Sequence, residues 1–149
     1  MERRPFFAST HKYDMHFVYA AFANFEDRVI VKVGRSMTPH SRITQVHVNS
    51  PFEIKQAVFA HIGSLKKANK FERLVQNRFA NFRTRGEWYL FSRDQSSEFN
   101  DGIRQCFHEA ACFRLKWTIM NIEAMKAAIL EKVKKYRGWI KSVDQKKAA

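Results

Sequence analysis

The sequence of 149 residues is long enough for one sizeable hydrophobic core and too short for two ordinary domains with a linker. Its 27 lysines and arginines exceed the 14 acidic residues, and this net charge of +13 indicates a polyanionic partner, whether DNA, RNA or acidic lipid. No apolar run approaches the roughly 18 residues that span a bilayer, and the first residues lack the apolar segment of a signal peptide, so we expect a cytoplasmic protein without a membrane partner.

The first predicted elements form a hairpin. Residues 1–15 are polar and basic without periodicity, and we expect them to form an N-terminal arm. Phe17–Phe25 and Val29–Val33 consist largely of β-forming residues, and a short polar turn separates them. Two such runs with a tight connection predict an antiparallel pair of strands.

A helix and a third strand are predicted next. Thr38 is a typical N-cap and Pro39 a typical first helical residue, so a helix is expected from Pro39 to about Val48. Pro51 ends it, because the residue before a proline is driven out of the α conformation. Phe52–Ile62 alternates loosely between apolar and polar residues, which predicts a third strand beside the hairpin.

A second helix completes the predicted domain. In Leu65–Phe82 the apolar residues recur at steps of three and four, which predicts an amphipathic helix. A turn at Arg83–Gly86 and a short strand at Trp88–Phe91 follow. The expected fold is therefore of the α/β (α+β) class, with a small, mainly antiparallel three-stranded sheet flanked by helices.

The remaining residues predict a basic helical extension. Asp94–Asn100 has the composition of a polar loop, while Ile103–Phe113 and Ile119–Lys135 have helical patterns, the second ending at Tyr136–Gly138. Its lysine-rich end is expected to contact a nucleic-acid backbone, and its apolar side to pack on the sheet. Two alternatives remain open: the lysines only add solubility, or the helix lies on a membrane surface.

Four polar residues of the predicted domain could hydrolyse a phosphodiester, a reaction that needs an activated water and neutralisation of the phosphate charge. Tyr19 could orient or deprotonate the water, while Lys32 could lower the pKa of that tyrosine and hold the phosphate. Arg42 could donate two parallel N–H groups to a phosphate oxygen, and Glu72 could be the sole protein ligand of Mg²⁺ or Mn²⁺. Taken singly, each residue could equally serve packing or surface charge.

The order and spacing of these residues resemble the GIY-YIG nuclease superfamily. The matching elements are Phe17-Val18-Tyr19, Lys32-Val33-Gly34, Arg42, Glu72 and Gly86-Glu87-Trp88-Tyr89. They are most similar to a phage- and mobile-element-associated branch with a K-[IV]-G second motif and a terminal G-E-W-[FY] motif. The resemblance implies a nuclease domain at residues 16–92, an extension at 93–149, and a metal-dependent endonuclease acting on nucleic acid, by preference DNA, and leaving a 5′-phosphate and a 3′-hydroxyl.

Departures from the family pattern leave two other hypotheses open. Gln76 stands where many members have a histidine, and Thr84 where many have an asparagine. The chain could therefore be a nucleic-acid-binding protein on an inactive nuclease scaffold. It could also be a phage or plasmid factor that inhibits a host protein. The source organism and the oligomeric state do not follow from the sequence.

Further basic residues are candidates for nucleic-acid contact. They lie on the second strand, on both predicted helices and in the extension: Arg35, His40, His47, Lys66, Lys70, Arg73, Lys132, Lys134, Lys135 and Arg137. The histidines and cysteines lack the paired spacing of a zinc site. We expect Cys106 and Cys112 to be reduced, buried thiols.

Overall fold

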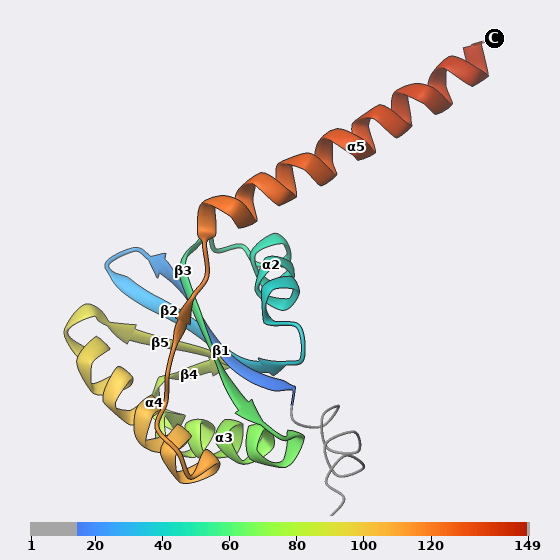
Figure 1. Ribbon diagram of the computed structural model, residues 1–149. Coiled ribbons are helices and arrows are strands. Elements are labelled where there is room, and N and C mark those ends of the chain that lie inside the picture. Colours follow the sequence, from blue (N-terminus) through green and yellow to red (C-terminus); the bar gives the residue numbers. More distant parts are fainter. Residues whose placement is uncertain (1–14, 149) are drawn as a thin grey trace, which may run out of the picture.

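The computed structural model describes residues 15–148, so nearly all of the predicted N-terminal arm lies outside the described residues. The chain forms a body of sheet and helices and then one long helix (Figure 1). The elements in chain order are β1 His16–Phe25, β2 Arg28–Ser36, α2 Pro39–Asn49, β3 Ile54–Gly63, α3 Leu65–Arg78, β4 Arg83–Arg85, β5 Trp88–Ser92, α4 Ser96–Ala111, β6 Thr118–Ile119 and α5 Ile122–Ala148. Short 3₁₀ turns lie at Ala80–Phe82 and Arg93–Gln95.

The sheet is antiparallel throughout, as predicted, but it has six strands rather than three, in the order β4-β5-β2-β1-β3-β6. β4 and β6 have three and two residues, too few to show an alternating pattern, so the sequence did not reveal them. β5 was predicted as a strand, and the structure places it beside β2. The central β1 pairs along most of its length with β2 and with β3.

Local chemistry explains where several elements begin. Glu26 adopts a positive φ of 57° in the tight turn between β1 and β2. Ser64 begins α3, and its hydroxyl accepts a hydrogen bond from Lys67 N at 3.2 Å. Thr38 does occupy the N-cap position of α2, but its side chain makes no capping hydrogen bond, and Pro39 supplies the pre-formed first turn.

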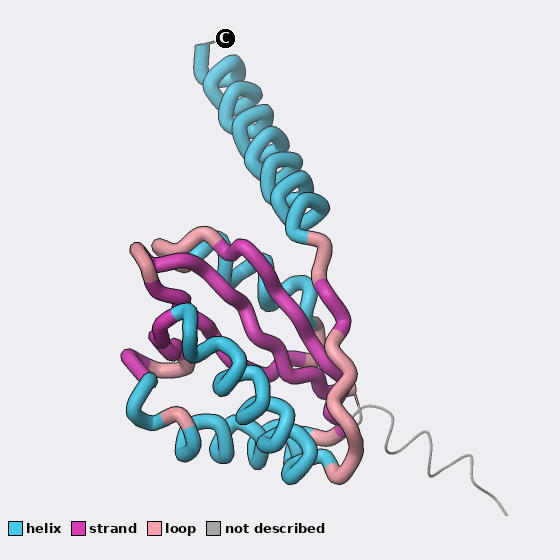
Figure 2. Tube along the Cα trace, turned by 90° about the vertical axis from the view of Figure 1, so that its left-hand side faces the viewer, coloured by secondary structure: helices cyan, strands magenta, loops and turns pink. Residues whose placement is uncertain are grey.

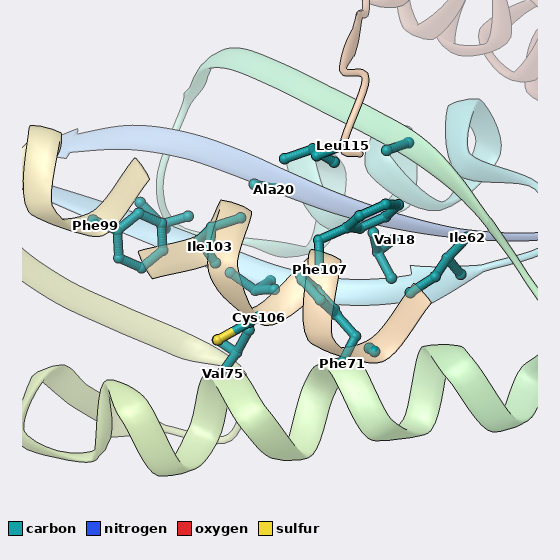
Figure 3. Packing of buried hydrophobic residues seen from close by; sticks show 14 of the residues in the cluster. Val18, Ala20, Ile62, Phe71, Val75, Phe99, Ile103, Cys106, Phe107 and Leu115 are labelled. Atoms are coloured by element: carbon teal, nitrogen blue, oxygen red, sulfur yellow. The ribbon is translucent and has the colours of Figure 1, made fainter. Parts of the chain in front are cut away.

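Each face of the sheet has its own hydrophobic cluster, because alternate residues of a strand point to opposite faces. On one face, Val18 and Ala20 of β1 pack with Phe71 of α3 and Phe107 of α4, as Figure 3 shows. On the other face, Tyr19 packs with a cluster that includes Ile43 of α2. Helices therefore cover both faces of the central strands.

The C-terminal region departs most from the prediction. α4 begins at Ser96, inside the predicted loop, after a capping box in which Gln95 and Ser92 bond each other's backbone. α4 ends at Ala111, and the residue that caps it, Cys112, has a left-handed φ of 64°. Cys112 is exposed whereas Cys106 is buried, so the expectation of two buried thiols is wrong for Cys112.

α5 continues through Gly138, where the prediction ended it, and projects away from the body (Figures 1 and 2). Packing against the body is confined to its first turns, where Met125 is buried and Lys126 Nζ lies 3.0 Å from Glu53 Oε1. Within residues 15–148, no helix combines the length and the apolar character needed to cross a membrane.

Candidate functional site

Tyr19 lies in the middle of β1, directly opposite Gly34 of β2. Its ring crosses that glycine so closely that a Cβ at residue 34 would lie 2.6 Å from Tyr19 Oη. A glycine is therefore needed there to leave room for the ring. The tyrosine is 0% exposed, and within the described residues its hydroxyl makes no hydrogen bond of regular geometry, although the Arg42 guanidinium interacts with it.

Glu72 reaches the site from α3, next to the fully buried Phe71 that anchors this helix in the core. Its Oε2 lies 3.5 Å from Arg35 Nε, at the end of β2. Its Oε1 is buried and, in the described part of the chain, lacks a hydrogen-bond partner. A buried polar atom without a partner costs about 1–3 kcal/mol, so two in one region indicate atoms kept available for a ligand.

Two cations come from neighbouring elements. Arg42 lies in the first turn of α2, where its backbone N–H donates to Thr38 O at 3.0 Å, and its guanidinium approaches the Tyr19 hydroxyl. Lys32, on β2, lies 3.8 Å from Glu87 Oε2 and 5.6 Å from the centre of the Trp88 ring. Lys32 therefore has a carboxylate and an aromatic face to hold its ammonium in place.

Glu87 is the residue that the sequence analysis missed. It was quoted as part of the Gly86–Tyr89 motif but was given no role. Val33 N donates to Glu87 O at 3.1 Å, which fixes the backbone of this residue against β2. Its carboxylate pairs with Lys32 and acts electrostatically on Tyr19, Arg42 and Glu72. An acidic residue inside a strongly basic segment was the available signal.

Burial has the largest effect on the pKa of Tyr19. It raises the pKa of Tyr19, the nearby Arg42 guanidinium opposes that rise, and the carboxylates of Glu87 and Glu72 add to it. The cation that acts on the pKa of Tyr19 is Arg42 rather than the expected Lys32, and the net shift is upward. The hydroxyl is protonated at neutral pH.

Glu72 is also shifted. Burial raises the pKa of Glu72, Glu87 raises it further, and the Arg35 guanidinium opposes both effects. The nearby Tyr19 oxygen raises the pKa of Arg42 as well, which secures the positive charge of the guanidinium.

The carboxylates fit a magnesium site of the kind that relies on substrate and water. Among residues 15–148 there is no group of three or more histidine, cysteine or acidic side chains that could enclose a metal ion. Mg²⁺ is often bound by one or two carboxylates, with phosphate oxygens and water completing the octahedron. The unpartnered Oε1 of Glu72, with Glu87 nearby, matches that requirement.

The predicted phosphate-contacting residues fall into three groups. Lys66, Lys70 and Arg73 are exposed and, at steps of four and three residues, share one stripe of α3. Arg35 lies beside this helix through its ion pair with Glu72. Arg35 is therefore brought to the carboxylate, whereas the stripe faces away from the buried side of α3, which carries Ala68, Phe71 and Val75.

The other two groups lie elsewhere. On α2, His40 is exposed against Phe59, with 4.9 Å between ring centres, while His47 Nδ1 accepts a hydrogen bond from Ile54 N at 3.1 Å. That bond commits one nitrogen of His47 to holding β3. The exposed residues of α5 project away from the body with their helix (Figure 1): Lys132, Lys134, Lys135 and Arg137.

The α+β body brings together a buried tyrosine, two carboxylates and several cations. These are the parts of a nuclease-like or DNA-binding protein. Residues 16–108 match the model of the T5orf172 domain, which is more than half of the chain. The chain belongs to this family, a phage-associated, nuclease-like domain. No curated protein and no solved structure matches the chain.

Proposed function

We propose that the protein is a metal-dependent endonuclease of GIY-YIG type that acts on DNA. One observation carries the proposal: within the described residues, Tyr19 Oη and Glu72 Oε1 are both buried without a hydrogen bond of regular geometry, and the Arg42 guanidinium lies beside the tyrosine. Such atoms do not stabilise the fold, whereas a phosphodiesterase needs polar groups that are available to bind water, metal and phosphate.

Each residue has a role that follows from its surroundings. Arg42 binds a non-bridging oxygen of the scissile phosphate through two N–H groups. Lys32, held by Glu87 and Trp88, places a second positive charge on that phosphate. The protonated Tyr19 uses its oxygen to orient the attacking water. Glu72, with Glu87 nearby, would hold Mg²⁺ or Mn²⁺, which when bound neutralises phosphate charge and acidifies water.

The test compares plasmid cutting by the full-length protein and by Glu72→Gln in Mg²⁺, in Mn²⁺ and in EDTA. The matched control is Glu109→Gln, which makes the same change on an exposed position of α4. We expect metal-dependent nicking by the wild type and by the control, and at least about a hundredfold loss in Glu72→Gln. Equal cutting by all three proteins would remove Glu72 from the mechanism.

A second candidate is nucleic-acid binding without cleavage. Arg35 already occupies one oxygen of Glu72, and Gln76 on the same helix cannot transfer a proton. In this case the plasmid is shifted on a gel at low salt but stays intact in every metal. The shift should weaken when Lys66, Lys70 and Arg73 are changed to glutamine, because each phosphate contact contributes to the affinity.

A further inference from the structure

The outer part of α5 presents large apolar side chains that no other part of the described chain (residues 15–148) covers. Val133, Tyr136, Trp139 and Ile140 are between 39% and 63% exposed, although valines, tyrosines and isoleucines of the body are buried. An isolated helix in water is marginal, because most helical stability in proteins comes from packing of an apolar face. A helix of 27 residues that projects alone therefore lacks its usual source of stability.

These side chains follow the pattern of a coiled coil. The apolar residues that we call the α5 seam are Ile129, Val133, Tyr136, Ile140 and Val143. They alternate by four and three residues, which is the heptad spacing that keeps one side of a helix facing a partner helix. Lys134, Lys141 and Gly138 lie on the opposite side of the helix, where water is expected.

A groove between α2 and α5 continues the seam to the body. It has a volume of about 690 Å³, and its walls include Val48 from α2 and Met125, Ile129 and Val133 from α5. Ile129 and Val133 belong to both the groove and the seam. One extended helix could therefore fill the groove at one end and cover the seam at the other.

We propose that α5 of a second copy of this chain occupies the groove and the α5 seam in antiparallel orientation, so that the protein is a dimer. With the symmetry axis between Lys134 and Lys135, Ile129 stacks on the partner's Ile140, and Val133 on the partner's Tyr136. The partner's Val143 then packs over the stem of Lys126, next to the groove residue Met125. Four of the five seam residues thus face apolar residues on the other α5, and Val143 faces the aliphatic stem of a lysine.

Charge selects this orientation over the parallel one. In a parallel pair, Lys132 would face the partner's Arg137 on both sides of the seam, and like charges across a coiled coil are unfavourable. In the antiparallel pair, Lys132 faces the partner's Trp139, a cation–aromatic contact. DNA is a poor occupant of the seam, because its phosphates cannot cover apolar side chains.

The same charges distinguish the dimer from a nucleic-acid complex. Residues 122–148 contain eight lysines and arginines and three acidic residues, so two copies of α5 repel each other. Salt screens that repulsion, whereas it weakens binding to phosphates. Dimerisation is therefore expected to strengthen with salt concentration while DNA binding weakens.

The first test is the solution mass of the full-length protein, measured by sedimentation equilibrium at low and high salt. Ile140→Asp introduces a charge into the seam, and Ser142→Asp introduces the same charge two residues away on an exposed position. We expect dimers of the wild type and of Ser142→Asp, and at least about a hundredfold rise in the dissociation constant for Ile140→Asp. A monomeric wild type, or an unchanged Ile140→Asp dimer, overturns the proposal.

A second experiment tests the orientation, in a chain whose Cys106 and Cys112 have been changed to serine. Ile129→Cys and Ile140→Cys proteins are prepared separately, mixed and oxidised. The antiparallel pair predicts a disulfide between the two different proteins. A disulfide between two copies of Ile140→Cys alone would require parallel helices and would contradict the arrangement. Circular dichroism and thermal unfolding of each variant show that the body is folded.

Discussion

The body and α5 use the same kinds of apolar residue, but most of those in the body are buried, whereas those in the outer part of α5 are exposed. Phe71 and Phe107 are 0% exposed between the sheet and its helices, whereas Tyr136 and Trp139 on α5 are more than half exposed. The body is therefore stabilised by its own packing, and this packing can offset the cost of leaving Tyr19 Oη and Glu72 Oε1 without partners. Polar atoms of this kind are available for catalysis, while the exposed apolar residues of the α5 seam are available for association with another chain.

The largest effect expected from this comparison is on folding. Phe107→Ala removes a ring packed edge-on against Phe71, with 6.0 Å between ring centres, and should lower the free energy of unfolding by about 3–5 kcal/mol. Trp139→Ala removes an exposed ring, and at protein concentrations below dimerisation it should change that free energy by less than about 0.5 kcal/mol. Urea unfolding curves measure both. Equal losses would mean that Trp139 is covered within one chain.

A smaller effect concerns alkaline pH. Burial raises the pKa of Tyr89 to about 12, with Arg83 opposing the rise and Glu87, Glu72 and Cys106 adding to it. The unfolded chain loses this proton near pH 10 and the folded chain only near pH 12. Stability is therefore complete below pH 10 and falls by about 2–3 kcal/mol as the pH rises through that interval.

Thermal unfolding measured from pH 8 to about pH 12 tests whether Tyr89 causes this loss of stability. Tyr89→Phe keeps the buried ring and should lose less stability at high pH than the wild type. Tyr136→Phe makes the same change on an exposed position of α5 and, at protein concentrations below dimerisation, should behave as the wild type does. The same alkaline loss in Tyr89→Phe as in the wild type would assign that loss to other groups.

The next effect concerns the site itself. Glu87→Gln removes the carboxylate that lies 3.8 Å from Lys32 Nζ, and the lysine keeps only the Trp88 ring to orient it. We expect about a tenfold slower cutting of plasmid in Mg²⁺, equivalent to about 1.4 kcal/mol. DNA binding in EDTA should be at least as strong as for the wild type, because one negative charge is lost. Unchanged cutting would show that the Glu87 carboxylate is not needed to orient Lys32 for catalysis.

The smallest effect is expected on the outer side of α5. Gly138 is helical, and a Cβ there would meet nothing within 4 Å. Gly138→Ala should therefore stabilise the helix by about 0.5–1 kcal/mol, seen as a higher helical content and melting temperature by circular dichroism. Dimer affinity should not fall, because residue 138 faces away from the seam. A weaker dimer would mean that Gly138 lies against another chain.

The sequence predicted the elements whose patterns are long enough to recognise. The hairpin, the third strand and the helix after Leu65 follow from period-two and period-3.6 patterns and appear close to their expected positions. β4 and β6 exist because neighbouring strands offer free backbone groups, which a local pattern cannot show. The start of α4 was missed because Ser96 and Ser97 suggest a loop, although a capping box precedes them.

The candidate site was predictable as a set of residues but not as an arrangement. The motif spacing indicated Tyr19, Arg42 and Glu72, and the fold brings the elements that carry them to one region. The direction of the Tyr19 pKa shift could not be predicted, because it depends on burial and on which cation is nearest. The role of Glu87 depends on the pairing of β5 with β2, which is a property of the folded sheet.

The measurement that tests the central claim most directly compares the cutting rate and the stability of Tyr19→Phe with those of the wild type. The substitution removes only the buried hydroxyl, which makes no hydrogen bond of regular geometry within the described residues. We predict that metal-dependent plasmid cutting falls at least about a hundredfold. The free energy of unfolding should change by less than about 1 kcal/mol, because the cost of burying the hydroxyl and its interaction with Arg42 oppose each other. A wild-type cutting rate, or a loss of stability above about 2 kcal/mol, would contradict the assignment of this hydroxyl to chemistry.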